Sequence, residues 1–273
     1  MLSPISWCPT RIERVEEVYD TSMGTAKVKT DAGRAYLKAM GNRQGPHALA
    51  SELVATQLAQ WFGLQVADFA VLEIPKEACF ELPRGAYVQP GPAFLSRQIE
   101  GATWGGSEAE LRSMENSDDI TRLVIFDTWV RNCDRHPPDL RTRKPNYANV
   151  YLANTNQAGR SRLIAIDHTH CFNCGRDLSP SLANISNTKD ERTYGLFPPF
   201  KEYITPFGLA WCRSLLASIK ADDVRRLVAS IPEPWDVDDL AKNALTELIC
   251  TRAAFLADRL ENWQPEIQRE EFS

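Results

Sequence analysis

One stretch of the chain, from Ile125 to Phe172, most constrains how the rest can be organised. An Asp-Arg-His triplet that begins at Asp134 follows an apolar, aromatic-rich run, and a second aspartate, Asp167, follows the apolar tetrad Leu-Ile-Ala-Ile. Between them Asn149 opens the short apolar run Val-Tyr-Leu. Carboxylate and amide oxygens are hard ligands suited to Mg²⁺, and a remaining carboxylate can accept a proton from an attacking hydroxyl. An acid at a helix end, an amide opening a strand and an acid ending the next strand therefore predict a site for phosphate and a metal ion.

The composition is that of an ordinary soluble protein, with 43% hydrophobic and 25% charged residues among 273. The net charge of -5 argues against nucleic acid as an obligatory partner, because phosphate backbones normally require a basic surface. A local basic cluster is nevertheless present at Arg141, Arg143 and Lys144. The N-terminus does not resemble a signal peptide, and no segment approaches the roughly 20 apolar residues that span a bilayer. These features predict a cytoplasmic protein without a membrane partner.

The seven cysteines are scattered and odd in number, which favours a reduced protein over a disulfide scaffold. Cys171 and Cys174 have the spacing of half a zinc site, with His168 and His170 just before them. No second half is evident in the sequence. Buried or partly buried thiols are therefore predicted here rather than structural zinc.

The N-terminal part reads as a small sheet that carries two charged groups of interest. Strands are predicted at 12–18, 26–28 and 35–40, with a hairpin turn at 31–34 and a helix at 47–62 that Gly63 ends. Small hydroxyl residues and a glycine at 20–25 can bring backbone N–H groups close to a phosphate. Lys38 lies in an otherwise apolar strand, and Glu52 lies in the second turn of the helix that follows. This arrangement can hold the lysine ammonium toward a nucleotide phosphate.

Further strands at 66–74 and 94–99 precede a change of pattern near residue 100. Helices are then predicted at 118–131, 206–219, 222–230 and 237–263. The fold class is α+β, with a small β-rich lobe that contains one helix over residues 1–100 and a mainly helical lobe over 101–273. Residues 96–100 form the predicted hinge, where backbone amides could pair with an adenine edge.

The ordered motifs resemble the HipA-like kinases of the protein-kinase-like superfamily, with kinship to the phosphatidylinositol-kinase catalytic loop. The segments that carry the resemblance are GRAYLKAM (33–40), ALASELVATQLAQWFGLQV (48–66), FDTWVRNCDRH (126–136) and LIAIDHTHCF (163–172). The resemblance implies a two-lobed kinase fold and a phosphotransferase that uses ATP and Mg²⁺.

The resemblance also implies roles for individual residues. Asp134 would orient or deprotonate the acceptor hydroxyl, Lys38 would contact the α- and β-phosphates with the support of Glu52, and Asn149 and Asp167 would hold Mg²⁺. The remaining nucleotide contacts would come from the first hairpin and the hinge, at Ser22, Met23, Gly24, Thr25, Ser96 and Gln98. Ser22 also lies where some relatives have an autophosphorylated serine. Members usually modify a serine or threonine of a protein, and some are toxins, so a protein substrate and an antitoxin or other regulatory partner are expected.

The metal-binding asparagine is where the chain departs from the family pattern. That asparagine typically follows the catalytic aspartate by five residues, and here the position holds Asp139. Either Asp139 replaces it, or residues 137–148 are an insertion and Asn149 takes the role. We favour Asn149, because the strand expected directly after the ligand begins at Val150; Asn146 is a further candidate. Two alternative functions stay open: an inactive kinase fold used as a binding or regulatory module, and a kinase for a small molecule.

Overall fold

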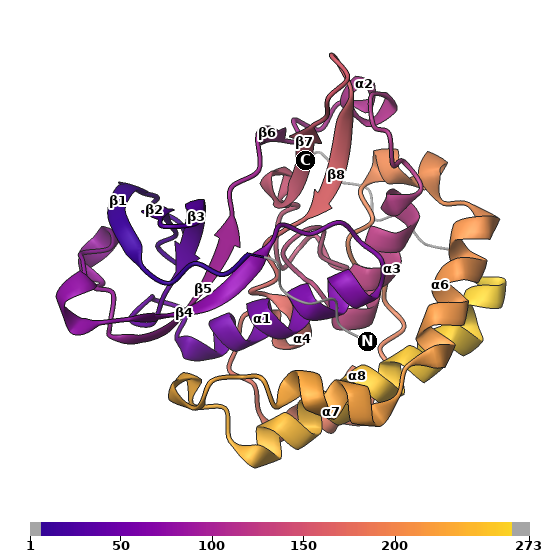
Figure 1. Ribbon diagram of the computed structural model, residues 1–273. Coiled ribbons are helices and arrows are strands. Elements are labelled where there is room, and N and C mark those ends of the chain that lie inside the picture. Colours follow the sequence, from indigo (N-terminus) through magenta and orange to yellow (C-terminus); the bar gives the residue numbers. More distant parts are fainter. Residues whose placement is uncertain (1–6, 264–273) are drawn as a thin grey trace.

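The computed structural model describes residues 7–263 and contains two antiparallel sheets and a group of helices (Figure 1). The first sheet has five strands in the order β1-β2-β3-β5-β4. Their bounds are β1 Ile12–Val18, β2 Ala26–Thr30, β3 Gly33–Lys38, β4 Phe69–Ile74 and β5 Gly91–Arg97. The predicted strands are thus confirmed in place. The third ends at Lys38 rather than Met40, because the chain turns at Gly41, where φ is +82°.

Apolar and charged residues alternate along the predicted strands, and in the structure they alternate between buried and more exposed positions. In β2, Ala26, Val28 and Thr30 are buried, while Lys27 and Lys29 lie on the other face. The buried apolar side chains join a small hydrophobic cluster under the sheet, to which loop residues such as Leu82 and Val88 also belong. This part of the sheet therefore has one covered face and one polar face, as antiparallel sheets commonly do.

Helix α1 (Pro46–Trp61) links this sheet to the helices downstream. Every residue from Ala48 to Ala59 is buried, so the helix is covered on all sides rather than along one stripe. It contacts β5, α4 and α7, and it lies between the sheet and the long C-terminal helices in Figure 1. One hydrophobic core consequently runs from α1 into the helical part, and Trp235 donates its indole N–H to Pro92 O at 2.9 Å to join the same two parts.

The second sheet has three strands, β6 (Gly101–Thr103), β7 (Val150–Asn154) and β8 (Ser161–Ala165), in that order. The sequence predicts β7 and β8, and it does not predict β6, which is only three residues long. The same half of the chain contains α2 (Glu108–Arg112), α3 (Asp119–Val130), α4 (Cys171–Cys174) and α5 (Ile185–Thr188), of which α3 contacts β8. Short 3₁₀ turns complete the connections.

Three C-terminal helices form the base of the helical part: α6 (Pro206–Ser218), α7 (Ala221–Val228) and α8 (Asp239–Arg259). Thr205 and Asp238 cap α6 and α8, because each side chain accepts the backbone N–H three residues further on. The predicted helices are confirmed with small shifts of their ends. Within the described residues, no helix is long and apolar enough to cross a membrane.

Candidate active site

A cavity of about 610 Å³ lies between the two sheets and is lined from both. Eight of the predicted site residues line it: Ser22, Thr25, Lys38, Glu52, Ser96, Asp134, Asn149 and Asp167. Four do not: Met23, Gly24, Gln98 and Asp139. A second cavity of about 700 Å³, bordered by His136 and by residues near Arg192 and Trp263, contains none of them.

Lys38, at the end of β3, lies between two carboxylates at the inner side of the cavity. Its Nζ is 2.8 Å from Glu52 Oε2 and 3.0 Å from Asp167 Oδ1, and its side chain is only 12% exposed. Burial by itself lowers the pKa of Lys38, but the charges of Asp167 and Glu52 outweigh it and raise that pKa above its ordinary value. The ammonium is therefore permanently charged and fixed in direction.

The two carboxylates respond differently to this lysine. Burial dominates at Glu52 and raises its pKa despite the ion pair. For Asp167, burial alone would raise the pKa, but Lys38 holds it well below the ordinary range. Glu52 also accepts the backbone N–H of His168 at 2.9 Å, so α1 contacts both β3 and the segment that follows β8.

The segment after β8 turns sharply at Asp167. The φ angle of Asp167 is +55°, a left-handed conformation that is uncommon for a non-glycine residue. Thr169 Oγ1 donates to Asp167 Oδ1 at 3.1 Å, the same oxygen that accepts from Lys38. Within residues 7–263, Oδ2 of Asp167 accepts no hydrogen bond and could bind a further ligand.

Asp134 follows the end of α3, where Arg131 adopts φ +55° and terminates the helix. The neighbouring Arg135 is fully buried, donates to Asp127 at 2.7 Å and to Ile166 O at 3.1 Å, and so ties this loop to the end of β8. A hydrogen bond from Asn132 to Asp127 at 3.0 Å stabilises the same turn. The loop after α3 and the segment after β8 are therefore joined, which brings Asp134 to the cavity that Asp167 also lines.

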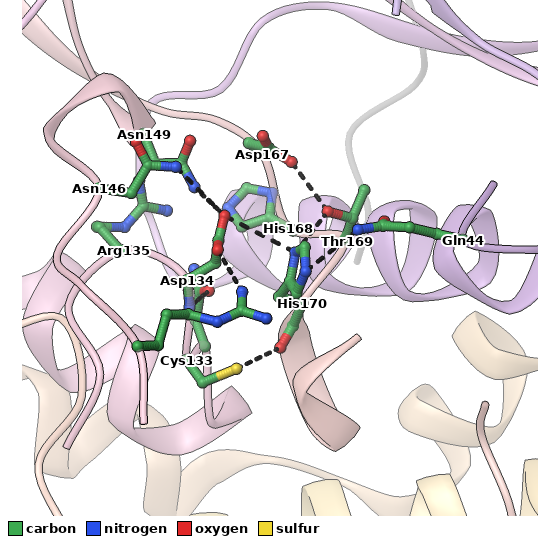
Figure 2. Close-up of polar contacts among 12 residues, drawn as sticks. Gln44, Cys133, Asp134, Arg135, Asn146, Asn149, Asp167, His168, Thr169 and His170 are labelled. Carbon is green, nitrogen blue, oxygen red and sulfur yellow. Dashed lines mark hydrogen bonds and ion pairs between the residues drawn. The ribbon is translucent and has the colours of Figure 1, made fainter. Parts of the chain in front are cut away.

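Among the residues that the structure describes, three side chains donate to the Asp134 carboxylate, as Figure 2 shows for the two asparagines. Asn149 Nδ2 lies 2.8 Å and Asn146 Nδ2 3.4 Å from Oδ2, while Arg143 pairs with Oδ1. Sequence reasoning did not assign Arg143 to this aspartate. The two residues are joined by a loop, and the hydrophobic periodicity of a sequence does not predict the conformation of a loop.

His170, which from the sequence could either support the loop of Asp167 or simply pack, lies between Asp134 and that loop. Its Nδ1 lies 3.1 Å from Thr169 Oγ1 and 3.8 Å from Asp134 Oδ2, and its Nε2 lies 3.2 Å from Gln44 Nε2 (Figure 2). Burial lowers the pKa of His170. The neutral ring therefore connects the surroundings of Asp134 with the threonine that contacts Asp167.

The first hairpin only partly fits its predicted role. Ser22 and Thr25 face the cavity, whereas the Met23 side chain is buried in the hydrophobic core. Gly24 has φ +61° and lies against Leu82, where a Cβ would come within 3.2 Å of Cδ1. Neither Met23 nor Gly24 lines the cavity, so their side chains give no support to the predicted nucleotide contact, and a contact through their backbone N–H groups stays a prediction.

The predicted hinge has the same mixed outcome. Ser96 faces the cavity, but β5 is an interior strand and pairs Ser96 with both Tyr36 and Phe69. Gln98 lies outside the cavity, and its backbone N–H donates to Arg34 O at 2.9 Å. Because this bond already satisfies the Gln98 N–H, the amide is not free to pair with an adenine edge.

Asp139 and Asn149 are the two candidates for the second metal ligand, and they lie in different surroundings. The Asp139 carboxylate accepts from Arg141 at 3.0 and 2.9 Å, outside the cavity, and these bonds lower its pKa to about 2. Asn149 is buried and lines the cavity. The geometry therefore favours Asn149, with residues 137–148 as a loop between the segment of Asp134 and β7.

The donor set of the cavity fits a magnesium ion that is shared with a nucleotide. Among the described residues, no group of three or more His, Cys, Asp or Glu side chains could hold a metal alone. Mg²⁺ usually needs only one or two protein carboxylates in such sites, because substrate phosphates and waters complete its octahedron. Asn149 directs its Nδ2 to Asp134, which leaves its Oδ1 for a metal, and Asp167 offers Oδ2. Both residues lie toward the top of the cluster in Figure 2.

Cys171 and Cys174 belong to no group of three or more metal-ligating side chains in the part of the chain that the structure describes. Cys171 is buried, and burial raises the pKa of its thiol. Cys174 is partly buried, and the thiol of Cys133, the residue before Asp134, lowers its pKa. The prediction of buried or partly buried thiols is confirmed.

Comparison with known proteins identifies the family and the fold. The family model described as HipA-like kinase matches residues 23–192, which is more than half of the chain. The crystal structure of the Helicobacter pylori proinflammatory kinase CtkA has the same fold, with a TM-score of 0.58 over 93% of this chain and 98% of that chain at 10% sequence identity. No curated protein matches the chain. The match over residues 23–192 includes Lys38, Glu52, Asp134, Asn149 and Asp167, and the chain belongs to the HipA-like kinase family.

Proposed function

We propose that this protein is an ATP- and Mg²⁺-dependent kinase that transfers the γ-phosphoryl group to a serine or threonine hydroxyl of a protein. One observation carries the proposal: a single cavity brings together the Lys38–Glu52 ion pair, Asp134, Asn149 and Asp167. Its volume of about 610 Å³ is within the range of small-molecule and cofactor sites.

The nucleotide would lie between the two sheets, with its phosphates toward Lys38. The first hairpin offers the Ser22 and Thr25 side chains, and the apolar walls at Phe69, Phe94 and Ile164 suit a base. Lys38 would neutralise phosphate charge, and Glu52 keeps its ammonium directed into the cavity. Asn149 and Asp167 would hold Mg²⁺, which supplies positive charge to the phosphate oxygens.

The acceptor hydroxyl would bind next to Asp134. In the transfer, the bond between the γ-phosphorus and the oxygen bridging to the β-phosphate breaks, and a bond from the acceptor oxygen to that phosphorus forms. The hydroxyl proton passes to the Asp134 carboxylate, and ADP and a phosphoester are the products. The protein forms no covalent bond to the phosphoryl group in this step, so most of the rate enhancement would come from the positioning of the reactants and from electrostatic stabilisation.

The test is transfer of radiolabelled phosphate from [γ-³²P]ATP, first to the protein itself and then to a protein library. We expect the wild type to transfer phosphate only with Mg²⁺, and Asp134→Asn to lose transfer by at least about 10³-fold while still binding ATP. Asp167→Asn should lose transfer too and, unlike Asp134→Asn, should also bind the nucleotide more weakly in the presence of Mg²⁺. Transfer that persists in both variants would refute the assignment.

The transfer assay, combined with calorimetry of ATP binding, separates the alternative functions. ATP binding by calorimetry without transfer to any acceptor would indicate a kinase fold used as a binding or regulatory module. Transfer to aminoglycosides or lipid head groups, but to no protein, would change the acceptor class and leave the site unchanged.

A further inference from the structure

Phosphoryl transfer concentrates negative charge between the nucleotide and the acceptor, so the positive groups on each side of the cavity matter. Lys38 supplies the charge at the inner side, where Glu52 and Asp167 hold it. Arg135 is next to Asp134 in sequence, but its guanidinium turns into the core and pairs with Asp127. It cannot supply charge to the acceptor side.

Arg143 is the cation that meets this requirement. Within the described residues, it is the only lysine or arginine within ion-pair distance of Asp134. It pairs with Oδ1, while Asn149 and Asn146 contact Oδ2. Its side chain is 35% exposed, so it lies at the boundary between the site and solvent, where an acceptor would enter.

The loop that carries Arg143 has an internal scaffold of its own. Thr142 donates to Asp139 O through its N–H at 3.1 Å and its hydroxyl at 2.7 Å, and Asn146 N–H donates to Arg135 O at 2.9 Å. Arg141, on the same turn, pairs with Asp139 and is 90% exposed. The turn therefore has hydrogen bonds that do not involve the Arg143–Asp134 pair, and it directs one arginine to the Asp134 carboxylate and the other into solvent.

We propose that Arg143 is a further catalytic residue of phosphoryl transfer, whose guanidinium contacts the oxygens of the phosphoryl group as it passes to the hydroxyl beside Asp134; this rests on the proposed function. A guanidinium presents several N–H donors in one plane, so it can contact a carboxylate and a phosphoryl oxygen at once. The contact would supply positive charge and hydrogen-bond donors and would take no proton from the acceptor. The proton of the acceptor still passes to Asp134.

The experiment compares wild type, Arg143→Ala, Arg143→Lys and the control Arg141→Ala from the same loop. Single-turnover transfer from [γ-³²P]ATP should fall by about 10²- to 10³-fold in Arg143→Ala. The Kd for Mg·ATP should change by less than about threefold, since the contact strengthens in the transition state. Arg143→Lys should retain part of the rate, and Arg141→Ala should match the wild type.

Two further measurements separate a catalytic role from a structural one. Guanidinium chloride at millimolar concentration, far below denaturing levels, should restore part of the rate of Arg143→Ala and none of that of Asp134→Asn. Mg·ADP with aluminium fluoride, which resembles the transferring group, should bind Arg143→Ala at least about tenfold more weakly than wild type, while Mg·ADP alone binds both equally.

Each outcome decides one of the two proposals. An unchanged or faster rate in Arg143→Ala would show that the ion pair with Asp134 is only a resting contact and would overturn the inference. The inference would also be overturned if Arg143→Ala lost as much affinity for Mg·ATP as it loses in transfer rate. It would be overturned likewise if guanidinium did not restore the rate and the affinity for Mg·ADP with aluminium fluoride were unchanged. If the wild type transfers no phosphate from ATP to any acceptor, the proposed function fails and takes this inference with it.

Discussion

Replacing Lys38 with methionine tests the electrostatics of the site through stability, independently of any substrate. Methionine approximates the length of the side chain and removes the ammonium that lies 2.8 Å from Glu52 and 3.0 Å from Asp167. Glu52 is only 5% exposed, so it would remain as a buried carboxylate whose donor is the His168 N–H. Removing one partner of a buried ion pair costs about 3–5 kcal/mol of unfolding free energy, and we expect a loss of that size.

The companion variant Glu52→Gln should lose much less unfolding free energy than Lys38→Met. The amide oxygen can still accept from His168 N–H, and Lys38 keeps Asp167, so we expect a loss of about 1–2 kcal/mol. The double variant Lys38→Met, Glu52→Gln contains neither of these two charges. It should therefore be more stable than the sum of the single losses predicts, with a coupling free energy of at least about 1.5 kcal/mol.

The loss in Lys38→Met should also depend on pH. Burial raises the pKa of Glu52 already in the wild type, and removing the lysine raises it further. A carboxyl group whose folded pKa lies above its unfolded value binds more protons when folded, so the variant recovers stability as the pH falls from about 7.5 to about 5.5. The loss relative to wild type should be smaller at the lower pH.

Urea unfolding followed by tryptophan fluorescence and circular dichroism measures these free energies. The control is Lys29→Met, which removes an exposed lysine paired with Glu13 on the same sheet and should leave the midpoint nearly unchanged. Single losses that add within about 0.5 kcal/mol would refute the reasoning, because independent sites behave in that way. A loss in Lys38→Met that is the same at both pH values would contradict the account of Glu52.

Three further outcomes follow from buried groups outside the Lys38 cluster. Arg252 is fully buried and donates to four backbone carbonyls of the α3 and α5 regions, so Arg252→Met should lower the unfolding free energy by about 3 kcal/mol in urea titrations. Its control, Arg259→Met on the exposed side of α8, should leave the midpoint in place. Burial lowers the pKa of His136 to about 4, so between about pH 4 and pH 6.5 this histidine is protonated in the unfolded chain and neutral in the folded chain. Stability should therefore fall as the pH drops below about 6.5, by about 1.4 kcal/mol at pH 5.5 from this residue, and His136→Asn should lose that part of the pH dependence. The Cys133 thiol lowers the pKa of Cys174, whereas burial raises that of Cys171, so iodoacetamide should label Cys174 faster than the buried Cys171 at neutral pH, and Cys133→Ala should slow that labelling. Peptide mass mapping reports the labelling rates, and equal rates would contradict this assignment.

The elements of the fold were largely predictable because local patterns encode them. Burial alternates along β2 as the sequence does, and α1 and α3 occupy the segments where helices are predicted. Short or irregular pieces escaped prediction, and β6 is the clearest case. Its three residues are a strand only because β7, which lies far along the chain, pairs with them.

The site residues were predictable as a set of chemical types in a fixed order. Their partners were not. Lys38 contacts Asp167 across 129 residues of sequence, and a strand lysine alone is equally compatible with a solvated position. The burial of α1 on all sides explains why its Glu52 needs that lysine, and this burial follows from the packing of two parts of the chain against one helix.

The sequence by itself determined which residues could do chemistry: the lysine in an apolar strand, the helical glutamate, and the three polar residues Asp134, Asn149 and Asp167. Only the tertiary structure decided which of them face one cavity. It directed Asp139 to Arg141, brought Arg143 to Asp134, and buried Met23 behind the first hairpin. The physical reason is that periodicity reports which face of an element is buried, whereas the path of a loop depends on contacts with residues far away in the chain.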